Sequence, residues 1–111
     1  MTSVFGKIIK GQLPSEKIFE NEHILVIKDL YPIAPVHLLI IPKKEIPDLQ
    51  SLQDEDVFLI GKIVEIAKKL AVEFGIENGY RLLTNNGPDA GQTIFHLHFH
   101  LIGGRKLGPM A

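Results

Sequence analysis

Histidine occupies every second position of residues 96–100, in the segment His-Leu-His-Phe-His, and two apolar residues follow at 101 and 102. Side chains of an extended strand alternate between two faces, so three imidazoles would project from one side and the intervening apolar groups from the other. Each imidazole changes protonation near neutral pH and can donate or accept a hydrogen bond. The pattern predicts a strand with one face toward a core and the other toward a ligand.

Composition and charge narrow the possible classes of protein. A chain of 111 residues with 45% hydrophobic residues fits one ordered globular domain, which we expect to span residues 1–111. The absence of cysteine excludes disulfides and thiolate metal sites and favours a reducing compartment. A formal charge of −1 provides no general attraction for nucleic acid. Because the chain also lacks a secretory signal and an apolar run of ~20 residues, we expect a cytoplasmic protein without a membrane partner.

The first half of the chain predicts a short helix and three strands. Ser3 is expected to cap a helix through residues 4–9 that stops at Gly11. Strands are expected over residues 16–20, 24–29 and 36–41, the first two joined as a hairpin and the third ended by a proline.

The second half predicts a long helix and two more strands. Ser51 and Asp54 resemble a capping box, and apolar residues then recur at helical spacing as far as Gly75. A fourth strand is expected over residues 80–85, a loop over 86–93 and the histidine strand over 94–102. The predicted fold class is α+β, with a mainly antiparallel five-stranded sheet, one long and one short helix, and a central histidine strand packed under the long helix.

Three interpretations of the histidine row remain open on the residues alone. The row could be a solvated strand face, or it could bind zinc through nitrogens at ~2.0 to 2.1 Å. All three side chains cannot easily share one ion, because His96 and His100 would lie ~13 Å apart at ~3.3 Å per residue, but two adjacent members and an outside ligand could. In the third interpretation, His98 is the nucleophile of a phosphoryl or nucleotidyl transfer and its neighbours orient the substrate or balance charge.

Two other segments favour phosphoryl chemistry. His37 begins a strand and would add a fourth imidazole if that strand lies beside the histidine strand. The glycine-containing loop 86–93 leads directly into the histidines, so its backbone N–H groups and the Thr93 hydroxyl could hold anionic oxygens.

The pattern His-x-His-x-His followed by two apolar residues resembles the signature of the histidine triad superfamily, and residues 96–102 match it at every position. The resemblance extends over nearly the whole chain, and the chain is most similar to the nucleotide-binding phosphoramidase branch of the superfamily. Other matching segments are Phe5-Gly6-Lys7-Ile8-Ile9, Asp29, Ala34-Pro35-Val36-His37, Ile41-Pro42-Lys43-Lys44, Gly79-Tyr80-Arg81, Asn85, Gly91-Gln92-Thr93 and Gly103-Gly104-Arg105.

The resemblance implies a homodimeric purine nucleoside phosphoramidase that needs no metal or other cofactor and works through a nucleotidyl-histidine intermediate. It implies that His98 is the nucleophile, supported by His37, His96 and His100. It assigns Asp29 to the ribose hydroxyls. The resemblance places the phosphate beside Asn85, Gly91, Gln92 and Thr93, and the base in an apolar slot formed by Val4, Phe5, Ile8, Leu13, Ile27 and Leu30.

Two further functions stay open beside this one. A neighbouring branch of the superfamily hydrolyses dinucleoside polyphosphates, although the long helix and the Gly-Gly-Arg segment at 103–105 fit the phosphoramidase branch better. A non-enzymatic nucleotide-binding adaptor dimer would keep the pocket and turn over little.

Overall fold

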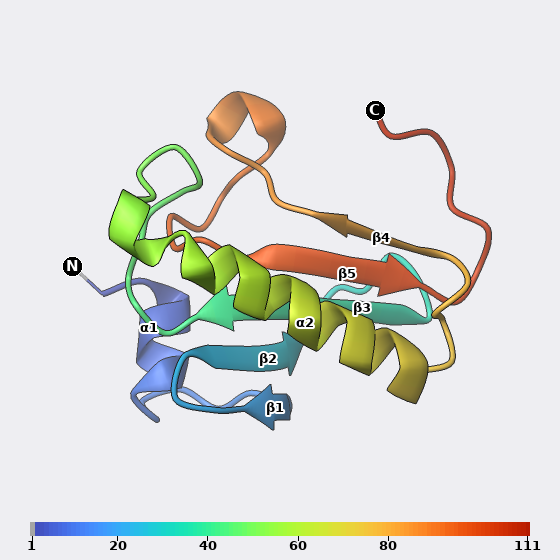
Figure 1. The fold of residues 1–111 in the computed structure, drawn as a ribbon, viewed down its shortest axis with the longest axis horizontal. Helices are drawn as coiled ribbons and strands as arrows, with labels where there is room; N and C mark the ends of the chain where they lie inside the picture. Colours follow the sequence, from blue (N-terminus) through green and yellow to red (C-terminus); the bar gives the residue numbers. More distant parts are fainter. Residues whose placement is uncertain (1) are drawn as a thin grey trace.

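The computed structural model describes residues 2–111 and contains two α-helices, two short 3-10 helices and five strands (Figure 1). In chain order these elements are α1 (Val4–Ile9), β1 (Lys17–Glu20), β2 (Ile24–Lys28), β3 (Val36–Pro42), η1 (Asp54–Asp56), α2 (Phe58–Glu73), β4 (Tyr80–Leu83), η2 (Pro88–Ala90) and β5 (Phe99–Gly103). The α+β class and the five-stranded sheet predicted from the sequence are confirmed.

The five strands form one sheet in the order β1-β2-β3-β5-β4, and every neighbouring pair is antiparallel. The histidine strand β5 therefore lies inside the sheet, between β3 and β4, as expected. β3 and β5 are separated by more than fifty residues in the chain, yet Leu39 lies opposite His100 and His37 opposite Ile102. The ladder thus brings two histidine-bearing strands side by side.

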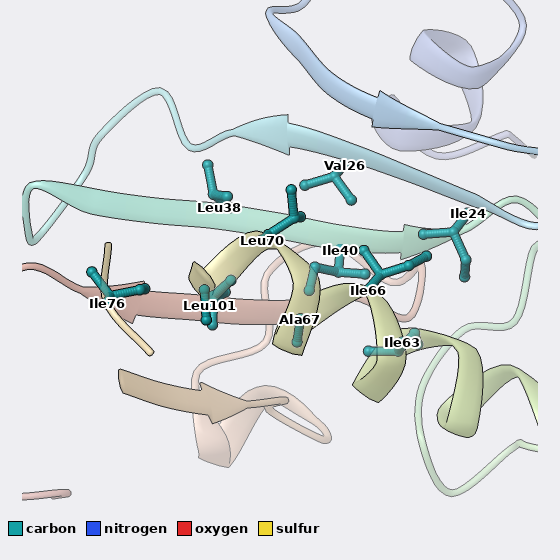
Figure 2. Close-up of a cluster of buried hydrophobic side chains, with 11 residues drawn as sticks. Ile24, Val26, Leu38, Ile40, Ile63, Ile66, Ala67, Leu70, Ile76 and Leu101 are labelled. Carbon is teal, nitrogen blue, oxygen red and sulfur yellow. The ribbon is translucent and has the colours of Figure 1, made fainter. Parts of the chain in front are cut away.

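Helix α2 lies across one face of the sheet (Figure 1). Its buried residues meet side chains from β2, β3 and β5 in the main apolar cluster, most of which Figure 2 labels. That cluster comprises Ile24, Val26, Leu38, Ile40, Ile63, Ile66, Ala67, Leu70, Ala71, Ile76 and Leu101. Burying these aliphatic groups removes them from water, which is the main favourable contribution to folding. Among residues 2–111, no helix is long and apolar enough to cross a membrane.

The opposite face of the sheet carries α1 and a second apolar cluster. It contains Phe5, Ile8, Leu25, Ile27, Leu39 and Ile41. Strand alternation explains this division, since odd-numbered residues of β2 and β3 face α1 while even-numbered residues face α2. Gly11 has φ of 77° just beyond α1, which glycine adopts without a Cβ penalty, so the short helix ends where the sequence predicts.

The predicted capping box at the start of the long helix is wrong. Ser51 lies in a turn, where its backbone N–H donates to Asp48 Oδ1 at 2.9 Å, and Asp54 begins the 3-10 helix η1. Helix α2 starts only at Phe58 and has 16 residues, so its length is about 24 Å at about 1.5 Å per residue. Its end is close to the expected position, because Gly75 has φ of 71°.

The histidine strand is also shorter than predicted, since β5 begins at Phe99 rather than at residue 94. Ladder pairing with β3 stops at Ile40 opposite Phe99, and the preceding chain turns to another partner, with the Leu97 N–H donating to the Ile46 carbonyl at 2.6 Å. The alternation of faces nevertheless persists. Leu97 joins an apolar cluster with Ile46 and Leu59, whereas the His96 ring lies against Phe5.

Candidate active site

His98 lies in the extended segment before β5, and one hydrogen bond determines its neutral tautomer. Its Nδ1 is 2.7 Å from the backbone carbonyl of His96. A carbonyl oxygen only accepts, so Nδ1 carries the proton and the lone pair of the neutral ring is on Nε2. The Phe5 ring packs edge-on at 4.9 Å between centroids, while the Thr84 hydroxyl donates to the His98 carbonyl at 2.7 Å. These contacts hold an imidazole with an available lone pair.

His96 is almost fully buried, and both nitrogens of its ring contact other parts of the chain. Its Nε2 donates to the Pro42 carbonyl at 2.7 Å, at the end of β3. Its Nδ1 lies 2.9 Å from the Ser3 hydroxyl, at the start of α1. Only 1% of the His96 residue is exposed, so its ring does not reach solvent.

The fourth imidazole predicted from the sequence joins the triad. His37 Nε2 and His100 Nδ1 are 2.9 Å apart, because β3 and β5 are neighbours and place the two residues diagonally on one face. The Ile33 N–H donates to His37 Nδ1, so neutral His37 carries its proton on Nε2 and donates it to His100. Neutral His100 is then protonated on Nε2, which leaves an N–H donor beside the nucleophile.

Burial lowers the pKa values of all four histidines. The effect is largest for His100, whose pKa falls to about 4, first through desolvation and then through repulsion by the adjacent His98 and His37 rings. The Asp29 carboxylate opposes this decrease at His37, His98 and His100. The cluster is therefore neutral near pH 7, the state that a nucleophilic imidazole requires.

Asp29 follows β2 and connects the histidines to the open side of the site. Its Oδ2 lies 3.4 Å from His37 Nε2, and its Oδ1 accepts from the Tyr31 N–H at 2.8 Å. Potential metal ligands of Asp29, His37 and His100 all lie within 4.8 Å of one another. A metal would be held by this trio rather than by two adjacent triad members, and it would break the existing His37–His100 hydrogen bond.

A cavity of about 590 Å³ lies on the α1 face of the sheet, and its wall contains none of the four histidines of the cluster. Its wall includes most of the predicted apolar slot, namely Val4, Phe5, Ile8, Ile27 and Leu30, together with Asp29 and Thr93. Leu13 is not on the wall, whereas the following Pro14 and Ser15 are. Phe5 and Asp29 contact both the cavity and the histidine cluster, so a ligand in the cavity would reach the imidazoles across these two residues.

The loop that precedes the histidines is held by Gln92. The Gln92 side chain accepts from the Gly87 N–H and donates to the carbonyls of Pro47 and Ile94, at 2.8 to 3.1 Å. Its amide therefore joins the two ends of the loop and ties the loop to the segment around Pro47. Gly91 has φ of 98°, and Thr93 lies on the cavity wall, whereas Asn85 follows β4 and is not on that wall.

A model of the HIT domain family matches residues 10–107. This chain belongs to the HIT family. An HIT-like protein of Chlamydia trachomatis is 52% identical over 111 residues, covering 100% of both chains. A HIT family hydrolase from Legionella pneumophila has a TM-score of 0.92 and 43% identity, covering 95% of each chain. A histidine triad nucleotide-binding protein from Candida albicans has a TM-score of 0.82 and 34% identity, covering 99% of this chain and 85% of that one.

Within this HIT domain, sequence reasoning missed several residues near the histidines. Leu39 lies on the cavity wall, and its position two residues after His37 in β3 was a usable signal, because both face the same side of the sheet. Ser3 was expected only as a helix cap. Its contact with His96 joins residues 93 apart in the chain, and no local pattern predicts it.

Proposed function

We propose that this protein is a purine nucleoside phosphoramidase, which hydrolyses the P–N bond of nucleoside 5′-phosphoramidates. The observation that carries the proposal is the tautomer of His98. Its Nδ1–H is committed to the His96 carbonyl, so its Nε2 lone pair is available for attack, and the Phe5 ring that packs on His98 also lines the 590 Å³ cavity. The hydrolase and nucleotide-binding descriptions of the similar structures support this class of chemistry.

The cavity has the chemical character that a nucleoside requires. Its apolar wall of Phe5, Ile8 and Ile27 suits the faces of a purine base, and Asp29 provides a carboxylate for the ribose hydroxyls. With the ribose at Asp29, the α-phosphorus lies toward His98, and the phosphate oxygens lie toward the Nε2–H of His100. We assign Thr93, Gly91, Gln92 and Asn85 to the phosphate side, where Gln92 acts by shaping the loop.

The proposed reaction has two displacements at phosphorus. His98 Nε2 attacks the phosphorus, a new P–N bond forms, and the P–N bond to the substrate amine breaks. The negative charge of the bound substrate favours protonation of an imidazole beside His98, and the departing nitrogen takes this proton, directly or through the Thr93 hydroxyl. Water then attacks the phosphorus of the nucleotidyl-His98 intermediate, returns a proton to the cluster, and releases the nucleoside monophosphate with His98 restored. Because one P–N bond replaces another, the intermediate lies close in energy to the substrate.

We further propose that the protein acts as a homodimer. β4 is an outer strand that pairs only with β5 within residues 2–111. The outward face of α2, continued by the residue that precedes it, carries apolar side chains at helical spacing, with 52% of Val57, 42% of Val64 and 63% of Val72 exposed. Pairing two copies through β4 and α2 would join their sheets and cover this face. Val64→Asp should give a monomer in light scattering, whereas Ile33→Asp, at another exposed apolar position, should not.

The test incubates the protein with adenosine 5′-phosphoramidate and follows amine release and the mass of the protein. We expect turnover and a transient nucleotidyl adduct on His98. His98→Ala should lose both while still binding adenosine monophosphate, and His23→Ala should behave as wild type because His23 packs on Phe58 outside the site. Turnover of a dinucleoside polyphosphate alone would contradict the proposal. Binding without turnover would indicate an adaptor, and loss of activity on chelation would indicate a metal enzyme.

A further inference from the structure

Ser3 makes two hydrogen bonds with one hydroxyl group. As the N-cap of α1, its Oγ accepts from the Gly6 N–H at 2.9 Å. The same oxygen lies 2.9 Å from Nδ1 of His96. A helix cap needs only the acceptor, so the O–H proton is available for the second contact.

The direction of the second bond follows from the other side of the His96 ring. Nε2 faces the Pro42 carbonyl at 2.7 Å and must carry a proton. Burial lowers the pKa of His96, so the ring is neutral and Nδ1 is an acceptor. Ser3 therefore donates its hydroxyl proton to His96 Nδ1. The ring is held at both nitrogens, by α1 on one side and by the end of β3 on the other.

This bond connects the cavity to the nucleophile. Val4, Phe5 and Ile8 of α1 line the cavity, and Ser3 immediately precedes them. On the other side, the backbone carbonyl of His96 accepts the Nδ1–H of His98 at 2.7 Å. A shift of α1 or a loss of the Ser3 hydroxyl would therefore move the group that sets the His98 tautomer. The Phe5 ring, which packs on both His96 and His98, adds a second contact along the same path.

We propose that Ser3 is a positioning residue that ties the nucleoside-binding helix α1 to the His96–His98 pair and so sets the tautomer of the nucleophile. This inference rests on the proposed function for its catalytic consequence, although the linkage itself is a property of the free protein. The Ser3 side chain then has two roles: it caps α1, which needs an acceptor, and it links α1 to His96, which needs a donor.

Three substitutions separate these roles. Ser3→Thr keeps both the acceptor and the donor. Ser3→Asp keeps a strong N-cap acceptor but has no proton to donate, and its carboxylate favours a proton on His96 Nδ1. Ser3→Ala removes both. If capping alone matters, the aspartate variant resembles wild type in both the histidine signals and helix stability. If the link matters, both the aspartate and the alanine variants change the histidine signals, but only the alanine variant lowers helix stability.

The first measurement is NMR of the free protein labelled with ¹⁵N-histidine, which reads the tautomer of each ring directly. We expect wild type and Ser3→Thr to show Nε2–H for His96 and Nδ1–H for His98. In Ser3→Asp, His96 should gain a proton on Nδ1 and the His98 signals should shift, while the thermal midpoint stays near that of wild type. Identical His96 and His98 signals in wild type and Ser3→Asp would overturn the proposal.

The second measurement is the kinetics of phosphoramidate hydrolysis. Ser3→Asp and Ser3→Ala should each lose about tenfold in kcat, the effect of one misplaced hydrogen bond near the reacting group, and Ser3→Thr should restore activity to within about twofold of wild type. Full kcat in Ser3→Asp would also refute the linkage. If wild type does not hydrolyse the phosphoramidate, the proposed function fails, and the NMR spectra alone then decide whether Ser3 sets the histidine tautomers.

Discussion

Because burial lowers the pKa of His100 in the folded protein, we expect the free energy of unfolding to fall in acid. An unfolded chain binds a proton at this histidine below its ordinary pKa of 6.5, whereas the folded protein binds it only near pH 4. Between these values the unfolded state holds more protons, so the free energy of unfolding falls as the pH falls. The stability contributed by keeping His100 neutral is fully present above pH 6.5 and is lost toward pH 4.

The magnitude follows from the difference between the two pKa values. From 6.5 to about 4 the difference corresponds to about 3 kcal/mol, at about 1.4 kcal/mol for each pH unit. His100 is only partly buried, so solvent screening reduces the expected effect to about half, on the order of 1 to 2 kcal/mol. This is a substantial fraction of the ~5 to 15 kcal/mol that stabilises a typical domain.

Urea denaturation measures this effect when wild type and His100→Gln are compared from pH 8 to pH 4. The glutamine side chain keeps a hydrogen-bonding group but does not titrate, so the variant should lose less stability than wild type over this range, by about 1 to 2 kcal/mol. NMR titration of His100 gives its pKa directly. Equal acid sensitivity of the two proteins, or a His100 midpoint at 6.5 or above, would refute the reasoning about burial and neighbouring imidazoles.

Three further predictions concern the site and the core. Because burial lowers the pKa of His98, the acidic limb of kcat/KM should lie below pH 6.5 within a bell-shaped profile, and a flat profile from about pH 5 to 9 would contradict this. By calorimetry, wild type should bind 2′-deoxyadenosine monophosphate about tenfold more weakly than the ribonucleotide, and Asp29→Asn should reduce this preference. An equal preference in the two proteins would mean that Asp29 does not bind the ribose hydroxyls. Leu101→Ala, at a fully buried position under α2, should cost about 2–5 kcal/mol in urea denaturation, and a loss below about 1 kcal/mol would mean that the core closes around the gap.

The periodic spacing of apolar residues accounts for most of the fold that could be predicted from the sequence. Alternating residues predicted which face of β5 meets the core, and Leu101 does pack under α2. The helical spacing of apolar residues predicted α2, and Gly11 and Gly75 predicted the helix ends because both adopt positive φ. These successes share a cause: local backbone geometry determines which side chains share a face.

The starts of two elements were not predictable in this way. The helix expected from Ser51 begins at Phe58, because Asp48 and η1 organise the preceding turn instead. The strand expected from residue 94 begins at Phe99, because the Leu97 N–H bonds to Ile46 outside the sheet ladder. At Ser51 a competing local turn outweighed the helical pattern, since Asp48 is its near neighbour in the chain. At Leu97 the partner is distant in the chain, and local propensity does not specify it.

The sequence by itself determined the chemical inventory of the site: three imidazoles at alternate positions, a fourth at His37, and a carboxylate at Asp29. Only the tertiary structure decided how these groups act, because pairing β3 with β5 places His37 against His100 and packing α1 on the sheet places Ser3 against His96. Tautomers and lowered pKa values depend on which atoms surround each ring and how much water is excluded. Those are properties of the packed chain, since the residues involved are distant in sequence and meet only after folding.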